Sequence, residues 1–334
     1  MGTHDAGVII AIVLAIAFNI VAGFNDGGNL LAAAASSRTI APGTAYLIIV
    51  AGAFAGPLVA GTAVAQTIGQ GIVDYRVAGE LTLLSGLLGG TITLLVAYAL
   101  SVPVSASIAL VSATIGALAA THQLGLVHWV GVVKVGISLV ASIVVGFTAG
   151  AVIYTLFVLA LRKVDLQTGL RLMRLQYLSV ALQAVGYGAN DAEKIMGLIV
   201  AAIALGSHDS TFAVPLWVVA VSVGAFACGM ALGGTRIAKT VGGKLFHIRP
   251  LHALSFQTAA AATVIAAAAA GGPLSSTETT ASAILGVGAA ANPRAVHWIV
   301  ARRLVLTWLL TAPIGLATGS AATFVFRTLF HGAR

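Results

Sequence analysis

Two polar motifs interrupt an otherwise apolar chain: GFNDGGN at residues 23–29 and GANDAEK at residues 188–194, the first and second ND motifs. Each contains an Asn-Asp pair, although only 8% of the 334 residues are charged. An aspartate at the centre of a bilayer costs ~2.5–3.5 kcal/mol even on the most lenient scale. If these segments cross a membrane, two such aspartates 165 residues apart indicate a function.

The residue types of the ND motifs predict an ion site. Glycine near an Asn-Asp pair weakens a helix, and Asn and Asp favour turns and caps, so we expect a broken helix at each motif. A break frees backbone groups, which membrane depth tolerates only around a protein-lined cavity. Carbonyl, amide and carboxylate oxygens there coordinate a cation, Na+ or H+. The oxygens come from Asn25, Asp26, Asn190 and Asp191. The competing interpretation, helix caps at the bilayer surface, explains one motif better than two symmetric ones.

Two Pro-Ser/Thr motifs supply the complementary chemistry, PVSAS at residues 103–107 and PLSSTETT at residues 273–280. Proline starts a helix where its missing N–H does no harm. The hydroxyls that follow lie beside free N–H groups at the positive end of the helix dipole, so each start can bind an oxyanion. Tight links before both prolines predict re-entrant hairpins. The alternative is ordinary Ser/Thr packing between helices.

Three further ionisable residues lie inside these elements: Glu193, Lys194 and Glu278. Lys194 follows Asp191 by three residues, which places both on one face of a helix. Lys194 pairs either with Asp191 or with a bound anion, and the sequence leaves both possibilities open.

The elements that must position these residues are membrane helices. The chain is 59% hydrophobic with a mean hydropathy of +1.04, well above the roughly 45–50% apolar content of soluble domains. About 20 apolar residues make one helical span. We therefore predict an all-α polytopic membrane protein with ten membrane elements, at residues 7–25, 43–70, 81–100, 103–120, 131–161, 176–206, 211–235, 253–271, 273–290 and 304–326. The single cysteine, Cys228, is expected to be a buried structural thiol.

Internal repetition gives the domain organisation. The ND motifs match each other, GTAVAQTIGQGIVDYR (61–76) matches GTRIAKTVGGKLFHIR (234–249), and residues 102–120 match 272–290. The three matches occur in one order at offsets of 165, 173 and 170 residues, which indicates a duplication. About five elements per half would insert the second copy upside down, as an inverted-topology repeat. The halves are residues 1–161 and 176–334, joined by a cytoplasmic linker at 162–175.

Basic residues set the predicted topology. In this arrangement 12 of the 17 Lys and Arg residues lie on one side, which the positive-inside rule makes cytoplasmic. Both termini then face outward from the cell (inner) membrane. The basic residues do not gather on one amphipathic surface with interleaved aromatics, so nucleic acid is not an expected partner despite the net charge of +8.

The same motifs resemble the inorganic phosphate transporter family, the low-affinity phosphate permeases. GFNDGGN, SSRTIAP, GANDAEKIMG, GGTRIAKTVGGKLFHIRPLH, PLSSTETTASAILGVG and WLLTAPIG carry the resemblance over nearly the whole chain. The resemblance implies an inverted repeat of broken helices and hairpins, in which both motif types hold phosphate and the coupling cation. By position it implicates Asn25, Asp26, Asn190 and Asp191, together with Ser105, Ser107, Ser275, Ser276 and Thr277.

Departures from the family pattern bear on substrate and coupling ion. The family hairpin usually reads PVSTTH, whereas Ile108 and Glu278 replace its His and Ala106 replaces one Thr. Gln257 stands where many members have Glu, which makes it a coupling-ion candidate, and Gly28 stands where Ala is usual. The family also includes sulfate permeases. Phosphate can donate a hydrogen bond at neutral pH and sulfate cannot, so carboxylates near the anion favour phosphate.

The resulting expectation is a secondary transporter and not an enzyme. It imports inorganic phosphate with H+ or Na+ by alternating access, binds the anion partly through Lys194, and needs no cofactor besides the coupling cation. The main alternative is a sulfate permease. Remote alternatives are an anion channel and an intramembrane aspartyl protease on Asp26 and Asp191, which would need both carboxylates to share a proton. The sequence does not fix the oligomeric state, and a homodimer is compatible with it.

Overall fold

The computed structural model describes residues 3–37, 40–172, 174–206 and 212–331, and nearly all their regular structure is helical. The elements up to the linker are α1 (Thr3–Ser37), α2 (Pro42–Ala60), α3 (Ala63–Gly69), α4 (Tyr75–Ala78), α5 (Glu80–Ala99), α6 (Ala106–Ala120) and α7 (Trp129–Leu161). After them come α8 (Leu166–Leu172), α9 (Leu175–Tyr187), the π-helical segment η2 (Gly188–Ala192), α10 (Glu193–Gly206), α11 (Leu216–Lys244), α12 (Pro250–Ala269), α13 (Ser276–Ala291) and α14 (Trp298–His331).

The all-α polytopic prediction is confirmed. Seven helices in the described part of the chain are long and apolar enough to cross a membrane: α1, α2, α5, α7, α11, α12 and α14. The remaining predicted membrane elements exist as helices but are shorter or interrupted. The helices α6 and α13 have only 15 and 16 residues, and η2 divides α9 from α10.

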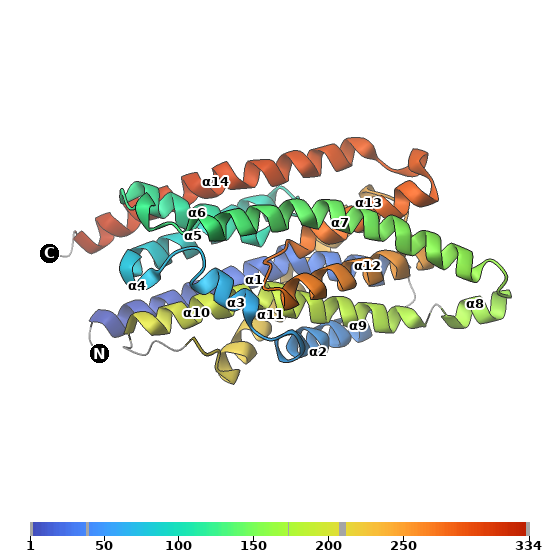
Figure 1. Ribbon diagram of the computed structural model, residues 1–334, viewed down its shortest axis with the longest axis horizontal. Coiled ribbons are helices and arrows are strands. Elements are labelled where there is room, and N and C mark those ends of the chain that lie inside the picture. Colours follow the sequence, from blue (N-terminus) through green and yellow to red (C-terminus); the bar gives the residue numbers. More distant parts are fainter. Residues whose placement is uncertain (1–2, 38–39, 173, 207–211, 332–334) are drawn as a thin grey trace.

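The long helices lie side by side in an elongated bundle (Figure 1). The start of α1 and the end of α14 lie at one end of the bundle, with α4, whereas α8 lies at the other end. This is the arrangement that the predicted topology requires, with both ends of the chain opposite the 162–175 linker. Which end faces the cytoplasm stays a prediction, as does the inverted orientation of the second half.

Glycines let the helices of the two ND motifs pack closely against helices from the other half. On α1, a Cβ at Gly23 would lie 2.3 Å from the Phe226 carbonyl oxygen of α11. On η2, a Cβ at Gly188 would lie 2.0 Å from the Ala53 carbonyl oxygen of α2. Contacts this short exclude any side chain unless a backbone moves. The first helix of each half therefore packs against the second helix of the other half.

The predicted helix break is wrong at the first ND motif, through which α1 continues without interruption. At the second motif the α-helix is interrupted by the π-helical turn η2, so the predicted break takes the form of a π-helical turn there. Asn25 stays inside α1 because its Nδ2 donates to the Val21 carbonyl, 3.3 Å away and one turn earlier, and to the Leu94 carbonyl of α5. The glycines serve close helix packing here, and interhelical contacts outweigh their low helix propensity.

Two helical hairpins are present at the Pro-Ser/Thr motifs, as predicted. The first is α5–α6 and the second is α12–α13, and each turns through a residue with positive φ, Ser101 at 57° and Gly271 at 65°. The short second helix of each hairpin packs against a long outer helix, α6 on α14 and α13 on α7. Whether the hairpins cross the whole membrane stays a prediction. The expectation of a buried cysteine is wrong, since Cys228 is exposed on α11.

Candidate functional site

The first ND motif meets the second hairpin. Thr277, in the first turn of α13, donates a hydrogen bond from Oγ1 to the Asp26 carboxylate of α1. Asn29, one turn further along α1, donates from Nδ2 to Thr277 Oγ1 at 2.9 Å. All three side chains are buried, at most 2% exposed. The Thr277 hydroxyl thus joins an amide donor to a carboxylate acceptor.

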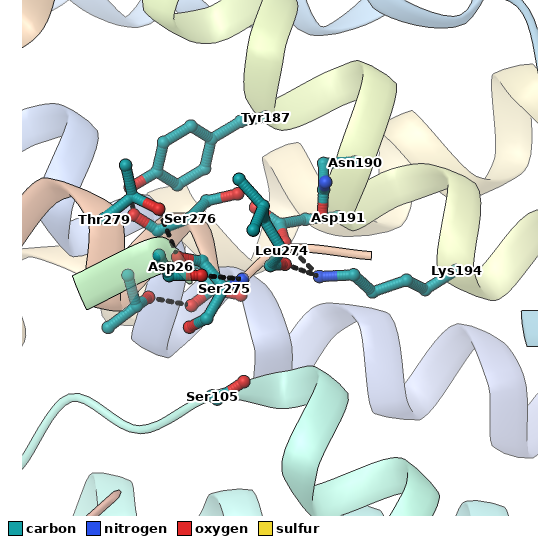
Figure 2. Close-up of polar contacts among 12 residues, drawn as sticks. Asp26, Ser105, Tyr187, Asn190, Asp191, Lys194, Leu274, Ser275, Ser276 and Thr279 are labelled. Carbon is teal, nitrogen blue, oxygen red and sulfur yellow. Dashed lines mark hydrogen bonds and ion pairs between the residues drawn. The ribbon is translucent and has the colours of Figure 1, made fainter. Parts of the chain in front are cut away.

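The second ND motif contacts the loop that precedes α13. The Lys194 ammonium lies 2.7 Å from Asp191 Oδ1 and donates to the Leu274 carbonyl at 3.0 Å (Figure 2). Asn190 Nδ2 donates to the Gly272 carbonyl at 3.3 Å. Of the two sequence alternatives for Lys194, pairing with Asp191 is the one present here. Lys194 and Asp191 are buried, at 2% and 5% exposure, and their pairing neutralises one positive and one negative charge.

The start of α13 is therefore the point on which both motifs converge. Its N-cap, Ser275, accepts from the Glu278 N–H through Oγ at 3.2 Å, which satisfies one free helix N–H. From α9, the Tyr187 hydroxyl donates to the Ser276 carbonyl at 3.1 Å and lies 2.9 Å from Thr280 Oγ1. The hydroxyl-rich first turn carries the positive end of a helix dipole between two aspartates and a lysine.

Several buried oxygens of the two ND motifs have no hydrogen-bond donor among the described residues. They are Asn25 Oδ1, Asn29 Oδ1, Asn190 Oδ1 and Asp191 Oδ2. A buried acceptor without a partner costs about 1–3 kcal/mol. Oxygen acceptors that lack donors are suited to a cation, because Na+ and H+ are bound by oxygen lone pairs. Three of these atoms belong to residues predicted as coupling-ion ligands.

The serines of the first hairpin have no described hydrogen bond to this cluster. Ser105 caps α6 by accepting from the Ile108 N–H at 3.3 Å, and in Figure 2 it lies on a separate ribbon away from the ND residues. Ser107 is fully buried and its Oγ has no hydrogen-bond partner among the described residues. The convergence of both hairpin starts on one cavity therefore stays a prediction, and of the two starts only that of α13 has described hydrogen bonds to both ND motifs.

Gln257 lies at the interface of α12 and α9. Its Oε1 accepts from the Ser179 hydroxyl at 2.9 Å, and its buried Nε2 has no hydrogen-bond partner in the described part of the chain. No described hydrogen bond joins Gln257 to either ND motif. Its predicted role as a coupling-ion residue therefore remains a prediction without a direct contact to support it.

Sequence reasoning missed several residues of the cluster. Asn29, Tyr187 and Gln183 each bond to the first turns of α13, Gln183 by donating from Nε2 to Thr280 Oγ1 at 3.2 Å. A signal for them was available. Each lies three or four residues from another polar residue of its own helix, so that one face of α1 and one face of α9 is polar within apolar sequence.

Comparison with known proteins matches most of the chain to one family. A sequence model described as the phosphate transporter family matches residues 22–174 and 162–319. A protein of Bacillus subtilis (strain 168), named a probable low-affinity inorganic phosphate transporter, is 33% identical, covering 96% of this chain and 98% of its own. A protein of Rhizobium meliloti (strain 1021) with the same name is 33% identical, covering 90% and 91%.

A solved structure has a similar fold. It is titled as the sodium-dependent phosphate transporter, and it superposes with a TM-score of 0.86 at 23% identity, covering 96% of this chain and 99% of its own. At this level of identity the likeness establishes the fold, and it agrees with the helical architecture described above.

Proposed function

The chain belongs to the phosphate transporter family, and from that membership we propose that it imports inorganic phosphate together with a cation. Its relatives are named as transporters and permeases, so the protein is a membrane transporter and not an enzyme. The substrate-binding and coupling-ion residues proposed here are those of the two ND motifs and the second hairpin, with Ser105 and Ser107 of the first.

The convergence of both ND motifs on the first turn of α13 carries this proposal. Free N–H groups and hydroxyls of a helix start bind an oxyanion. Ser275, Ser276 and Thr277 supply that start, and Lys194 lies 3.0 Å from the Leu274 carbonyl beside it. Asp26 adds an acceptor for the proton of hydrogen phosphate. Sulfate has no such proton at neutral pH, so a buried carboxylate would repel it without compensation.

Cation coupling follows from electrostatics. Moving an anion into a negative cytosol costs ~2.3 kcal/mol per charge for each 100 mV, so accumulation requires a compensating cation. The acceptors without donors at Asn25, Asn190 and Asp191 support a cation site next to the anion. The solved relative is titled as sodium-dependent, which favours Na+ as one candidate, and H+ is the other.

Alternating access completes the proposal. The repeats predict that the two halves are inverted copies of each other, and these halves would rock about the start of α13. Location in the inner membrane with both termini outside, and assembly as a homodimer, belong to the same proposal. A sulfate permease of the same family is the alternative that differs in substrate alone.

Uptake by proteoliposomes tests the function. Purified protein is reconstituted, and labelled phosphate and sulfate are offered separately under an imposed Na+ gradient or an imposed pH gradient. We expect accumulation of phosphate above equilibrium, driven by at least one gradient, and little uptake of sulfate. Preference for sulfate would establish the alternative substrate. Equilibration without accumulation would indicate a channel and overturn the symport mechanism.

A further inference from the structure

One buried carboxyl group takes no part in the ND cluster, by which we mean the hydrogen-bonded side chains that join the two ND motifs to the start of α13. Glu278, in the first turn of α13, is 1% exposed, and its Oε1 has no hydrogen-bond partner among the described residues. An ionised carboxylate without a partner is costly to bury, and in an apolar setting the group takes up a proton instead. The position of Glu278 inside a membrane helix therefore calls for a physical explanation.

Helix capping does not account for Glu278. Ser275-x-x-Glu278 has the spacing of a capping box, in which the Glu side chain would accept from the Ser N–H. That N–H is instead donated to Ser142 Oγ of α7, at 3.1 Å. The first hairpin has Ile108 at the matching position, and Ser105 still caps its N–H. A capped helix start thus forms in this chain without a carboxyl group, so the fold itself does not need Glu278.

Glu278 lines an apolar cavity of about 270 Å³ between α6, α7, α13 and α14. The matched residue Ile108 lines it too, with Leu139 and Ile143 of α7 and Trp308 of α14. Val140 and Leu309 at its rim are 64% and 68% exposed, on helices that are candidate membrane spans. The cavity therefore opens toward the outer, lipid-facing surface of α7 and α14.

The charges around Glu278 favour two protonation states. The cavity-lining residues of α6, α7 and α14 carry no titratable side chain, so the carboxyl is stable there only when protonated. Near the start of α13 the charged groups are Lys194, which donates to the Leu274 carbonyl, and Asp191, which pairs with that lysine. From α1, Asp26 binds the neighbouring Thr277. The α13 dipole and Lys194 would stabilise the carboxylate, whereas the cavity stabilises the neutral acid.

We propose that Glu278 is a proton-binding site separate from the ND cluster, and that its proton is the one exchanged during coupled transport. Rocking of the halves moves the carboxyl between the apolar cavity and the polar side of α13. Because Thr277 lies next in sequence and binds Asp26, occupation of the anion site changes the surroundings of Glu278 directly. This inference rests on the proposed phosphate symport.

Chemical labelling tests the protonated, lipid-accessible state without any substitution. Dicyclohexylcarbodiimide partitions into bilayers and reacts with neutral carboxyl groups. The acid transfers its proton to a carbodiimide nitrogen while its oxygen bonds to the central carbon, and nothing leaves. In proteoliposomes we expect residue-level mass mapping to find Glu278 labelled. Asp165 is the internal control because this linker carboxylate is exposed and accepts from the Thr168 N–H at 3.1 Å, both of which favour its ionised form. An unlabelled Glu278 would overturn the proposal.

Transport measurements separate proton coupling from phosphate binding. Phosphate exchange between vesicles and medium moves no net protons, whereas accumulation driven by a pH gradient does. With no Na+ gradient, we expect Glu278→Gln to retain exchange within about 2-fold but to lose pH-driven accumulation by ~10-fold or more. Glu278→Ile, which copies the first hairpin, should behave alike. Asp165→Asn, an exposed carboxylate of the linker, is the control and should retain both activities.

Each outcome is decisive. Normal pH-driven accumulation by Glu278→Gln overturns the proposal. Loss of exchange together with accumulation in a protein that elutes normally on size exclusion assigns Glu278 to phosphate binding and also overturns it. Failure of the proposed function itself is distinct, since the unmodified protein would then neither exchange nor accumulate phosphate.

Discussion

The two ND motifs have the same central dipeptide but lie in different backbones. The first lies in the continuous helix α1, whereas the second lies in the π-helical turn η2 between α9 and α10. Their packing partners differ in the same way. The helix α11, which packs against α1, is continuous, whereas α2 and α3, which pack against η2 and α10, are separated at Gly61. Matching motifs therefore do not require matching backbones; what both motifs share is their contact with the second hairpin.

The two hairpins differ more strongly. Polar side chains of α1, α9 and α10 bind the second hairpin near the start of α13. The first hairpin is bound at its loop by other helices, with Trp308 Nε1 donating to the Pro103 carbonyl at 3.0 Å and Arg236 donating to the Ala99 carbonyl at 2.7 Å. The two hairpins thus have similar helix order, but the polar contacts with both ND motifs are made near the start of only the second hairpin's short helix among the described residues.

The largest expected effect is loss of either aspartate. Asp26→Asn removes the carboxylate that accepts from Thr277, and Asp191→Asn leaves Lys194 buried without a counter-charge. We expect each substitution to lower phosphate uptake by ~100-fold or more, equivalent to ~2.7 kcal/mol, while the protein still folds. Proteoliposome uptake measures it, with size exclusion as the check on folding. Normal transport by both variants would rule out this site.

Glycine substitutions compare the two ND helices in stability. Gly188→Ala and Gly23→Ala each place a Cβ within 2.3 Å of a backbone carbonyl oxygen, so we expect losses of about 1–3 kcal/mol. Gly224→Ala on α11 is the matched control, since a Cβ there meets no atom within 4 Å. Thermal unfolding in detergent measures the change. A loss confined to one ND helix would mean that only that interface is tightly packed.

Hydroxyl deletion compares the hairpins directly. Thr277→Ala removes the hydroxyl that joins Asn29 to Asp26, and we expect the KM for phosphate to rise by ~10-fold. Ser107→Ala in the first hairpin removes a proposed phosphate-binding hydroxyl that has no described hydrogen bond to either ND motif, so we expect a smaller rise in KM, of ~3-fold. The comparison fails if the two variants have equal transport kinetics.

The smallest expected effect concerns the anchor of the first hairpin. Arg236 is exposed, donates to Ser101 Oγ and the Ala99 carbonyl, and lies 5.3 Å from the centre of the Tyr98 ring. Because exposed contacts are weakened by solvent, Arg236→Ala should lower stability by about 0.5–1 kcal/mol. Unfolding in detergent is again the measurement, and phosphate uptake should stay near normal. A loss of uptake comparable to that of Asp26→Asn would show that the anchor of the first hairpin is essential for transport.

The sequence by itself determined the class of protein and the candidate residues of its site. Hydropathy is a local property, so each of the ten apolar segments is mostly helical in its described part, although two of them are divided into shorter helices. The cost of burying Asp26 and Asp191 drew attention to both ND motifs. Proline followed by hydroxyl residues defined the capped starts of α6 and α13 for the same local reason.

Only the tertiary structure decided how these parts combine. A glycine inside a helix can mark either a break or a close contact, and the neighbouring helix decides which of the two occurs. Because α11 packs against the glycines of α1, this helix stays intact where the sequence predicted a break. Asp26 and Thr277 are 251 residues apart. No local feature of the sequence predicts that Asp26 pairs with the second hairpin and not with the first, which is nearer in sequence. The roles of Asn29 and Tyr187, and the cavity that receives Glu278, likewise depend on which helices pack together.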